Sequence, residues 1–127
     1  SQSYFGVLRG LHFQKSPYEQ SKLIRVVKGK IQDVVVDIRK ESNTFGKYIS
    51  VELSENNKNQ LFIPKGFAHG FLVLSKVATV LYKVDKSYNP ISESGYRYDD
   101  PVFNIKWMLD KKDVILSDKD KQLPFIK

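Results

Sequence analysis

Short apolar runs of β type, each ended by a polar or glycine-containing turn, follow one another along most of the chain. The turns recur at intervals of roughly ten residues and helical periodicity is almost absent, which favours an all-β sandwich or barrel. The junctions at 28–29 and 75–76 predict β-hairpins. The runs predict strands over residues 6–13, 22–29, 30–38, 47–53, 60–64, 68–75 and 76–85.

The pattern weakens after residue 85. Residues 86–101, "KSYNPISESGYRYDDP", are polar and aromatic and are predicted to form a long loop. The run "VFNIKWML" at 102–109 predicts a short closing strand. The remaining segment predicts a short C-terminal helical turn that is capped near Asp110.

Composition narrows the possible classes of protein. A length of 127 residues corresponds to one domain. The absence of cysteine excludes disulfides, thiolate metal sites and cysteine nucleophiles, and favours a cytoplasmic protein. No apolar run approaches the roughly 20 residues that a membrane span needs, so we expect no membrane association. The net charge of +7 suggests an anionic partner, but no basic recognition helix is visible. We interpret much of the excess positive charge as solvated surface, because the lysines form no tract, and expect some of it to serve one phosphate-bearing small molecule. No nucleic acid is expected as a partner.

The two histidines, His12 and His69, are the first candidates for chemistry. A lone histidine in a strand is more often a structural residue than a catalyst, and that interpretation stays open for each. In a regular strand His12 and Arg9 would lie on opposite faces, so a shared cavity requires a bulge, which Gly10 would permit. Without a bulge, Arg9 would lie on the outer surface, and both interpretations stay open. Two histidines exclude a three-histidine metal site, although a site with one added carboxylate stays open.

Other polar residues have two interpretations each. Lys22 begins an otherwise apolar strand face and is either an oxyanion-binding ammonium or an edge lysine whose head reaches solvent. Tyr82 and Tyr88 are either packing residues or proton donors. The stretch that contains Lys119 and Asp120 is either an exposed charged turn or the source of a carboxylate that orients an imidazole.

Several blocks together resemble one known family across essentially the whole chain. The blocks are "GVLRGLHFQ", "SKLIRVVKGKIQDVVVDIR", "TFGKYISVELS", "QLFIPKGFAHGFLVLS", "LYKVDKSYNP", "DDP" and "LSDKD". In order and spacing they resemble the dTDP-4-dehydrorhamnose 3,5-epimerases. This resemblance implies a cupin-like (jelly-roll) barrel of two antiparallel sheets and a homodimer without metal or cofactor. The implied substrate is a dTDP-sugar, dTDP-4-dehydro-6-deoxy-D-glucose, which is epimerised at C3 and C5 to dTDP-4-dehydro-L-rhamnose.

The resemblance also implies roles for individual residues. His12 would be the base, Asp120 its partner, Tyr82 the acid and Lys22 the group that stabilises the enolate. The residues implied in binding the sugar nucleotide are Arg9, His69, Glu93 and Lys119, with Tyr88 at the mouth of the pocket.

Members of the family carry a further N-terminal segment, so we expect residues 1–127 to form a single epimerase domain without it. Three alternatives remain: an epimerase acting only at C3 or only at C5, a catalytically silent sugar-nucleotide-binding cupin, and a metal-dependent cupin.

Overall fold

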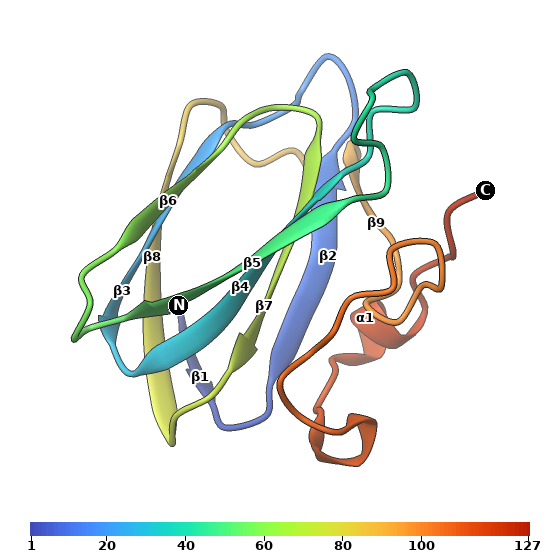
Figure 1. Cartoon of the computed structure of the whole chain (residues 1–127). Helices are drawn as coiled ribbons and strands as arrows, with labels where there is room; N and C mark the ends of the chain where they lie inside the picture. The colour runs from blue at the N-terminus through green and yellow to red at the C-terminus, as the bar shows by residue number, and fades with distance from the viewer.

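The computed structural model describes all 127 residues, and it consists of two antiparallel sheets that face each other (Figure 1). The four-stranded sheet has the order β1 (Gln2–Tyr4), β8 (Val77–Val84), β3 (Lys22–Lys28), β6 (Gln60–Ile63). The five-stranded sheet has the order β5 (Tyr48–Ser54), β4 (Lys30–Asp37), β7 (Phe67–Val73), β2 (Leu8–Gln14), β9 (Glu93–Gly95). The all-β prediction and the two antiparallel sheets are therefore confirmed.

Two short helices follow the strands, a 3₁₀ helix at Lys111–Asp113 and α1 at Asp118–Lys121. The first begins after Asp110, where the sequence predicts a helical turn, although the Asp110 side chain makes no capping hydrogen bond. Neither helix is long and apolar enough to cross a membrane. Strands β1 and β9 were not predicted, and β9 lies inside the stretch interpreted as a loop.

The inner and outer faces of β4 are both buried. Ile31 and Val35 belong to the core between the two sheets, whereas Val34 and Val36 pack beneath the C-terminal segment. Figure 1 shows that segment, coloured orange to red, outside the five-stranded sheet. A strand covered on both faces carries a nearly continuous apolar run, which explains the sequence "VVVD".

Both hairpin predictions are wrong. Strands β3 and β4 lie in different sheets, and so do β7 and β8. Each short turn carries the chain from one sheet to the other, because each strand can then direct an apolar face into the shared core. The two turns also pack together: a Cβ on Gly29 would lie 2.0 Å from the Val77 carbonyl oxygen, and the Lys30 amide donates to Ser75 Oγ at 2.9 Å.

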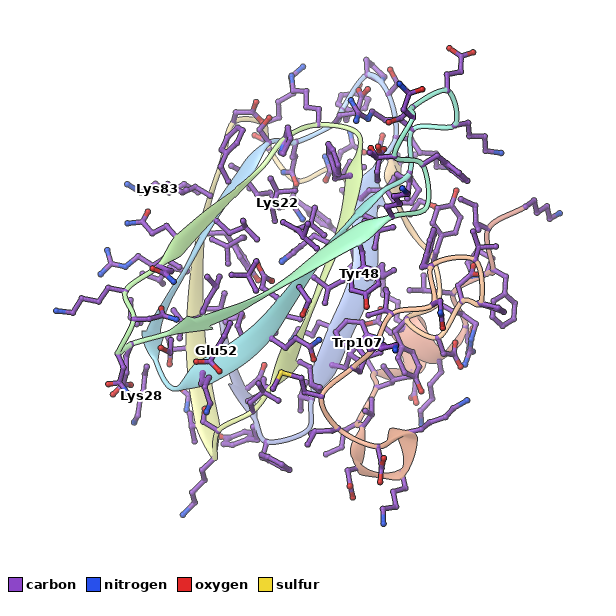
Figure 2. The ribbon with its side chains drawn as sticks, viewed as in Figure 1. Lys22, Lys28, Tyr48, Glu52, Lys83 and Trp107 are labelled. Carbon is purple, nitrogen blue, oxygen red and sulfur yellow. The ribbon has the colours of Figure 1, made fainter.

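The predicted strand at 102–109 is also wrong. This segment lies across the outer face of the five-stranded sheet instead of pairing at an edge, and side chains of the sheet bind its backbone. Gln32 donates to the Lys106 carbonyl at 3.1 Å and accepts from the Met108 amide at 2.9 Å. The Lys106 amide donates to the Tyr48 hydroxyl at 3.1 Å, and Figure 2 shows Tyr48 beside this segment. Side chains of the sheet thus bind part of this backbone in place of a strand partner.

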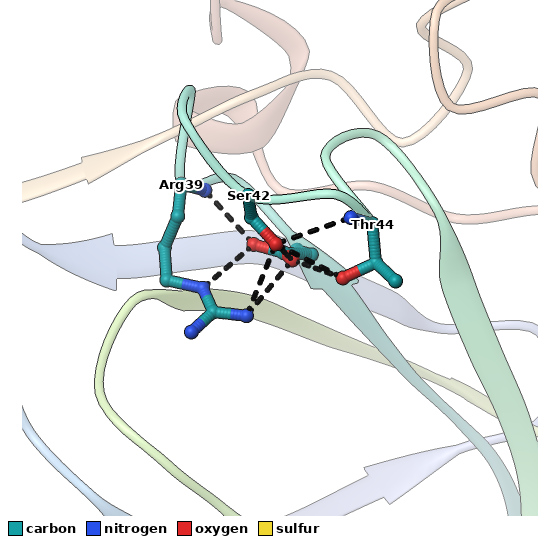
Figure 3. A network of polar contacts seen from close by, with 4 residues as sticks. Arg39, Ser42 and Thr44 are labelled. Carbon is teal, nitrogen blue, oxygen red and sulfur yellow. Dashed lines mark hydrogen bonds and ion pairs between the residues drawn. The ribbon is translucent and has the colours of Figure 1, made fainter.

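A polar network closes the end of β4 (Figure 3). The buried Asp37 carboxylate accepts two hydrogen bonds from the Arg39 guanidinium at 3.0 Å, and others from the hydroxyls of Ser42 and Thr44. The hydrogen bonds from Arg39 hold the pKa of Asp37 well below its usual range, against the opposing effect of burial. The network fixes the loop between β4 and β5.

Candidate active site

A bulge in β2 brings two predicted site residues to one face. Arg9 pairs with Phe71 and His12 pairs with His69, so two residues of β2 lie opposite a single residue of β7. Arg9 and His12 consequently both face the space between the sheets, where both line one cavity. Gly10 lies within the bulge with φ +118°. The bulge that a cavity shared by Arg9 and His12 would require is therefore present.

The bulge depends on two glycines that lie against each other. A Cβ on Gly10 would lie 2.7 Å from the Gly70 Cα, and a Cβ on Gly70 would lie 2.8 Å from the Arg9 carbonyl oxygen. The bulge also directs Leu8 and Leu11 to the same side, and both are completely buried under the C-terminal segment. The bulge therefore directs Arg9 and His12 into the cavity between the sheets, and Leu8 and Leu11 to the outer face of the sheet.

His12 is paired with Asp120, which is carried by α1. His12 Nε2 lies 2.7 Å from Asp120 Oδ1, and the Gly10 amide donates to Asp120 Oδ2 at 3.0 Å. Ser117 caps α1 by accepting from the Asp120 amide. Because a carboxylate only accepts, Nε2 carries the proton and Nδ1 keeps its lone pair. The pair therefore fixes one nitrogen of His12 as the basic one.

Burial raises the pKa of Asp120, but other interactions outweigh it. Hydrogen bonds from His12 and from the Gly10 amide, together with the charge of His12 when its imidazole is protonated and the charge of Lys119, bring the pKa of Asp120 below its usual value. The carboxylate is thus kept ionised although only 4% of the residue is exposed. An ionised partner stabilises a positive charge on the imidazole.

His12 and Tyr82 line a single cavity of about 370 Å³ from opposite sheets. His12 comes from β2 in the five-stranded sheet, whereas Tyr82 comes from β8 in the four-stranded sheet. A flat ligand held between the two sheets would therefore meet the imidazole and the phenol from different sides. The cavity is lined by Arg9, His12, Phe13, Gln14, Gln20, Lys22, His69, Phe71, Tyr82, Val84, Tyr88 and Glu93.

Lys22 enters the same cavity from β3. Figure 2 shows Lys22 between the sheets and Lys83 on the outside of the four-stranded sheet. Burial lowers the pKa of the Lys22 ammonium, while the negative charge of Asp33 opposes that shift. A partly desolvated cation interacts more strongly with a developing negative charge than a solvated one does.

A second histidine–carboxylate pair lies on the inner faces of β7 and β4. His69 Nε2 lies 2.5 Å from Oδ1 of Asp33, which is completely buried, and the other oxygen of Asp33 has no hydrogen-bond partner. The sequence analysis did not identify Asp33. The sequence feature that could have identified it is a carboxylate at an inward-facing position of an apolar strand, because a buried carboxylate requires a polar partner.

The remaining predicted residues lie around the cavity at different depths. Arg9 also donates from Nε to Ser3 Oγ at 3.2 Å, and Tyr88 is an exposed residue of the cavity mouth. Glu93 lines the cavity and forms an ion pair with Lys119. Lys119 itself does not line the cavity, so it reaches this site through Glu93.

The metal-site alternative is not assembled in this arrangement. His12 and His69 each direct Nε2 to a different carboxylate, Asp120 and Asp33. No group of three or more histidine, aspartate or glutamate side chains is placed to hold a metal ion.

Comparison with known proteins supports the resemblance seen in the sequence. The model of the dTDP-4-dehydrorhamnose 3,5-epimerase family matches residues 1–127. The chain is 52% identical, over 120 residues, to the dTDP-4-dehydrorhamnose 3,5-epimerase of Shigella flexneri. The aligned region covers 94% of this chain and 65% of that protein. The chain thus spans about two thirds of the length of this relative.

Solved structures give the same result. The dTDP-4-dehydrorhamnose 3,5-epimerase of Elizabethkingia anophelis superposes with a TM-score of 0.96 at 47% identity, covering 98% of this chain and 68% of that one. The dTDP-6-deoxy-D-glucose-3,5-epimerase of Legionella pneumophila, solved in complex with dTDP-4-keto-L-rhamnose, gives a TM-score of 0.94 at 50% identity and covers 98% and 65%. The expected cupin-like fold is confirmed, and the chain belongs to the dTDP-4-dehydrorhamnose 3,5-epimerase family.

Proposed function

We propose that the protein epimerises dTDP-4-dehydro-6-deoxy-D-glucose at C3 and C5 to dTDP-4-dehydro-L-rhamnose, a step of dTDP-L-rhamnose biosynthesis. The observation that carries the proposal is the placement of His12 and Tyr82 in one cavity on opposite sheets, with Lys22 in the same cavity. Inversion of a carbon centre next to a ketone requires a base on one face, an acid on the other and a group that stabilises the enolate oxygen.

In this mechanism His12 removes a proton from a carbon next to the C4 ketone. The C–H bond breaks, the electron pair moves into the enolate, and the proton is held on Nδ1 of the imidazole. Asp120 stabilises the resulting imidazolium through its contact with Nε2. The Lys22 ammonium stabilises the enolate oxygen, and the Tyr82 phenol returns a proton to the opposite face.

Both C3 and C5 are next to the C4 ketone, so one set of groups serves both centres. The carbon skeleton keeps its atoms and its oxidation state, and the protons lost and gained balance through solvent. Arg9 is the group best suited to the diphosphate, because a guanidinium forms paired hydrogen bonds with phosphate oxygens. His69, Glu93 and Tyr88 contact the remainder of the sugar nucleotide, and Lys119 orients Glu93.

Solvent exchange tests the proposal directly. In deuterated water the protein is expected to introduce deuterium at C3 and C5 of dTDP-4-dehydro-6-deoxy-D-glucose, as measured by NMR, and His12→Ala is expected to abolish it. Lys83→Ala, on the outside of the barrel, serves as the control and should leave exchange unchanged. Exchange at one carbon alone would establish the single-centre alternative. Binding without exchange would establish the silent cupin.

We propose in addition that the protein works as a homodimer in the cytoplasm. The family resemblance supports the dimer, and the absence of cysteine is consistent with that compartment. Sedimentation equilibrium should give twice the mass of the chain, and a mass of one chain at micromolar concentration would contradict the dimer.

A further inference from the structure

Two loops at the mouth of the cavity are joined by one buried side chain. Residues 15–21 connect β2 to β3, and residues 85–92 connect β8 to β9. Gln14 donates from Nε2 to the Tyr18 carbonyl at 2.6 Å, and its Oε1 accepts from the Asn89 amide at 2.8 Å. Only 7% of Gln14 is exposed. One amide group therefore binds the backbone of both loops.

Gln14 also belongs to the cavity itself. It follows His12 on β2 and lines the same cavity. Each of the two loops contributes one further lining residue, Gln20 from the first and Tyr88 from the second. The position of these two side chains consequently depends on the loops that Gln14 joins.

Backbone hydrogen bonds join the two loops at their ends. The Lys15 amide donates to the Ser92 carbonyl at 2.8 Å, and the Asp85 amide donates to the Ser21 carbonyl at 3.3 Å. The other side-chain hydrogen bonds between the loops are exposed to solvent. Gln20 Nε2 donates to the Lys86 carbonyl at 2.6 Å, and the Ser21 amide donates to Asp85 Oδ1 at 2.9 Å. Water competes for exposed groups of this kind, so their net contribution is small, whereas a buried group left without its partner is costly. Gln14 is therefore the buried side chain that joins the middle parts of the two loops, at Tyr18 and Asn89, beyond the backbone bonds at their ends.

We propose that Gln14 is a positioning residue for substrate binding, which holds the two loops together so that Tyr88 and Gln20 close the mouth of the cavity over the sugar nucleotide. The proposal rests on the proposed epimerase function. The chemistry of the site explains the residue type. One loop presents a carbonyl, which needs a donor, and the other presents an amide, which needs an acceptor. A carboxylate supplies only the acceptor and a hydrocarbon supplies neither.

Two variants test the proposal. Gln14→Met keeps the length of the side chain and removes both hydrogen bonds. Gln14→Glu keeps the acceptor for Asn89 and removes the donor for Tyr18. Gln60→Met, an exposed position of β6 on the outer face of the barrel, is the matched control. Amide hydrogen exchange is measured by NMR, and steady-state kinetics are measured with dTDP-4-dehydro-6-deoxy-D-glucose.

For Gln14→Met we expect the Asn89 amide to exchange at least about tenfold faster and KM to rise by about ten- to thirtyfold, as the loss of two buried hydrogen bonds implies. kcat should change less than about threefold, because His12, Lys22 and Tyr82 remain in place. Gln14→Glu should keep the protection of Asn89 while KM still rises, since only the bond to the loop at 15–21 is lost.

Unchanged exchange at Asn89 together with an unchanged KM in Gln14→Met would overturn the proposal. So would a fall in kcat at constant KM, which would assign Gln14 to the chemical step. Amide hydrogen exchange at Asn89 does not depend on catalytic turnover. It therefore tests whether Gln14 holds the two loops together even if the unmodified protein shows no epimerase activity. Inactivity of the unmodified protein would instead count against the proposed function.

Discussion

Replacement of Asp120 by asparagine tests the proposed base most directly. The side chain keeps its size, but an amide presents one acceptor and one donor where the carboxylate presents two acceptors. If its oxygen stays with the Gly10 amide, its NH₂ group faces His12 Nε2. The imidazole must then accept at Nε2 and carry its proton on Nδ1. The nitrogen that should remove the substrate proton is therefore already protonated.

We expect kcat to fall by about 10³- to 10⁴-fold, the size of effect known when a buried carboxylate that fixes a catalytic imidazole becomes an amide. KM should change little, because Asp120 does not line the cavity. The assay is the initial rate of deuterium incorporation at C3 and C5. Raising the pH should not restore the rate, since the defect is a tautomer and not a protonation state.

Asp118→Asn provides the matched control. Asp118 lies two residues earlier in α1, its side chain is 98% exposed, and its only ionic contact is with Lys121 at 4.0 Å. This variant should retain the rate of the unmodified protein. If Asp120→Asn also retained kcat to within about tenfold, the assignment of His12 Nδ1 as the base would be refuted.

Three further predictions concern the bulge, the cation and the polar network. Gly10→Ala should lower the free energy of unfolding by about 3 kcal/mol in urea titration, because both the positive φ and a backbone clash oppose a Cβ. Gly46→Ala, where φ is also positive but a Cβ would meet Val102 only at ordinary contact distance, should lose only about 1 kcal/mol. Lys22→Met should lower kcat by about 10²- to 10³-fold, whereas Lys83→Met should not. Because burial lowers the pKa of Lys22, the rate of the unmodified protein should fall on the alkaline side below pH 10.5, and a flat pH–rate profile would contradict this role. Asp37→Asn should cost about 2–3 kcal/mol at pH 7. The pKa of Asp37 is lowered, so its stabilisation is complete above pH of about 4 and is lost as the pH falls below that; the variant should show a weaker loss in acid.

The sequence predicted most strands because burial of one face imposes a period of two, and burial of both faces, as in β4, gives a short continuous apolar run between turns. Seven of the nine strands were identified, and the need for a bulge at Gly10 followed from the opposite parity of Arg9 and His12. Strands β1 and β9 were missed, since three residues are too few to show a period.

Strand pairing was not predictable in the same way. A short turn with glycine, such as Lys28–Gly29, is compatible both with a hairpin and with a crossing between sheets, and only the packing of the whole barrel decides between them. The segment 102–109 is apolar because it covers the outer face of the five-stranded sheet. A segment that covers a sheet and a strand that pairs at its edge are similarly rich in apolar residues, so composition does not distinguish them. Asp33 was missed because its partner lies 36 positions away.

The order of the strands has a consequence for the kinetics of folding. Among the strand pairings, only that of β4 with β5 joins strands that are consecutive in the chain. Strand β1 pairs with β8, and β2 pairs with β7 and β9, so these pairings form only after much more of the chain has been made. Closing such long loops makes folding slow compared with that of helical proteins of similar size. His12 leaves the ribosome 108 positions before the carboxylate that orients it. During synthesis the imidazole therefore exists for most of the time without its partner, and proton abstraction should appear only after the last turn of the chain has docked.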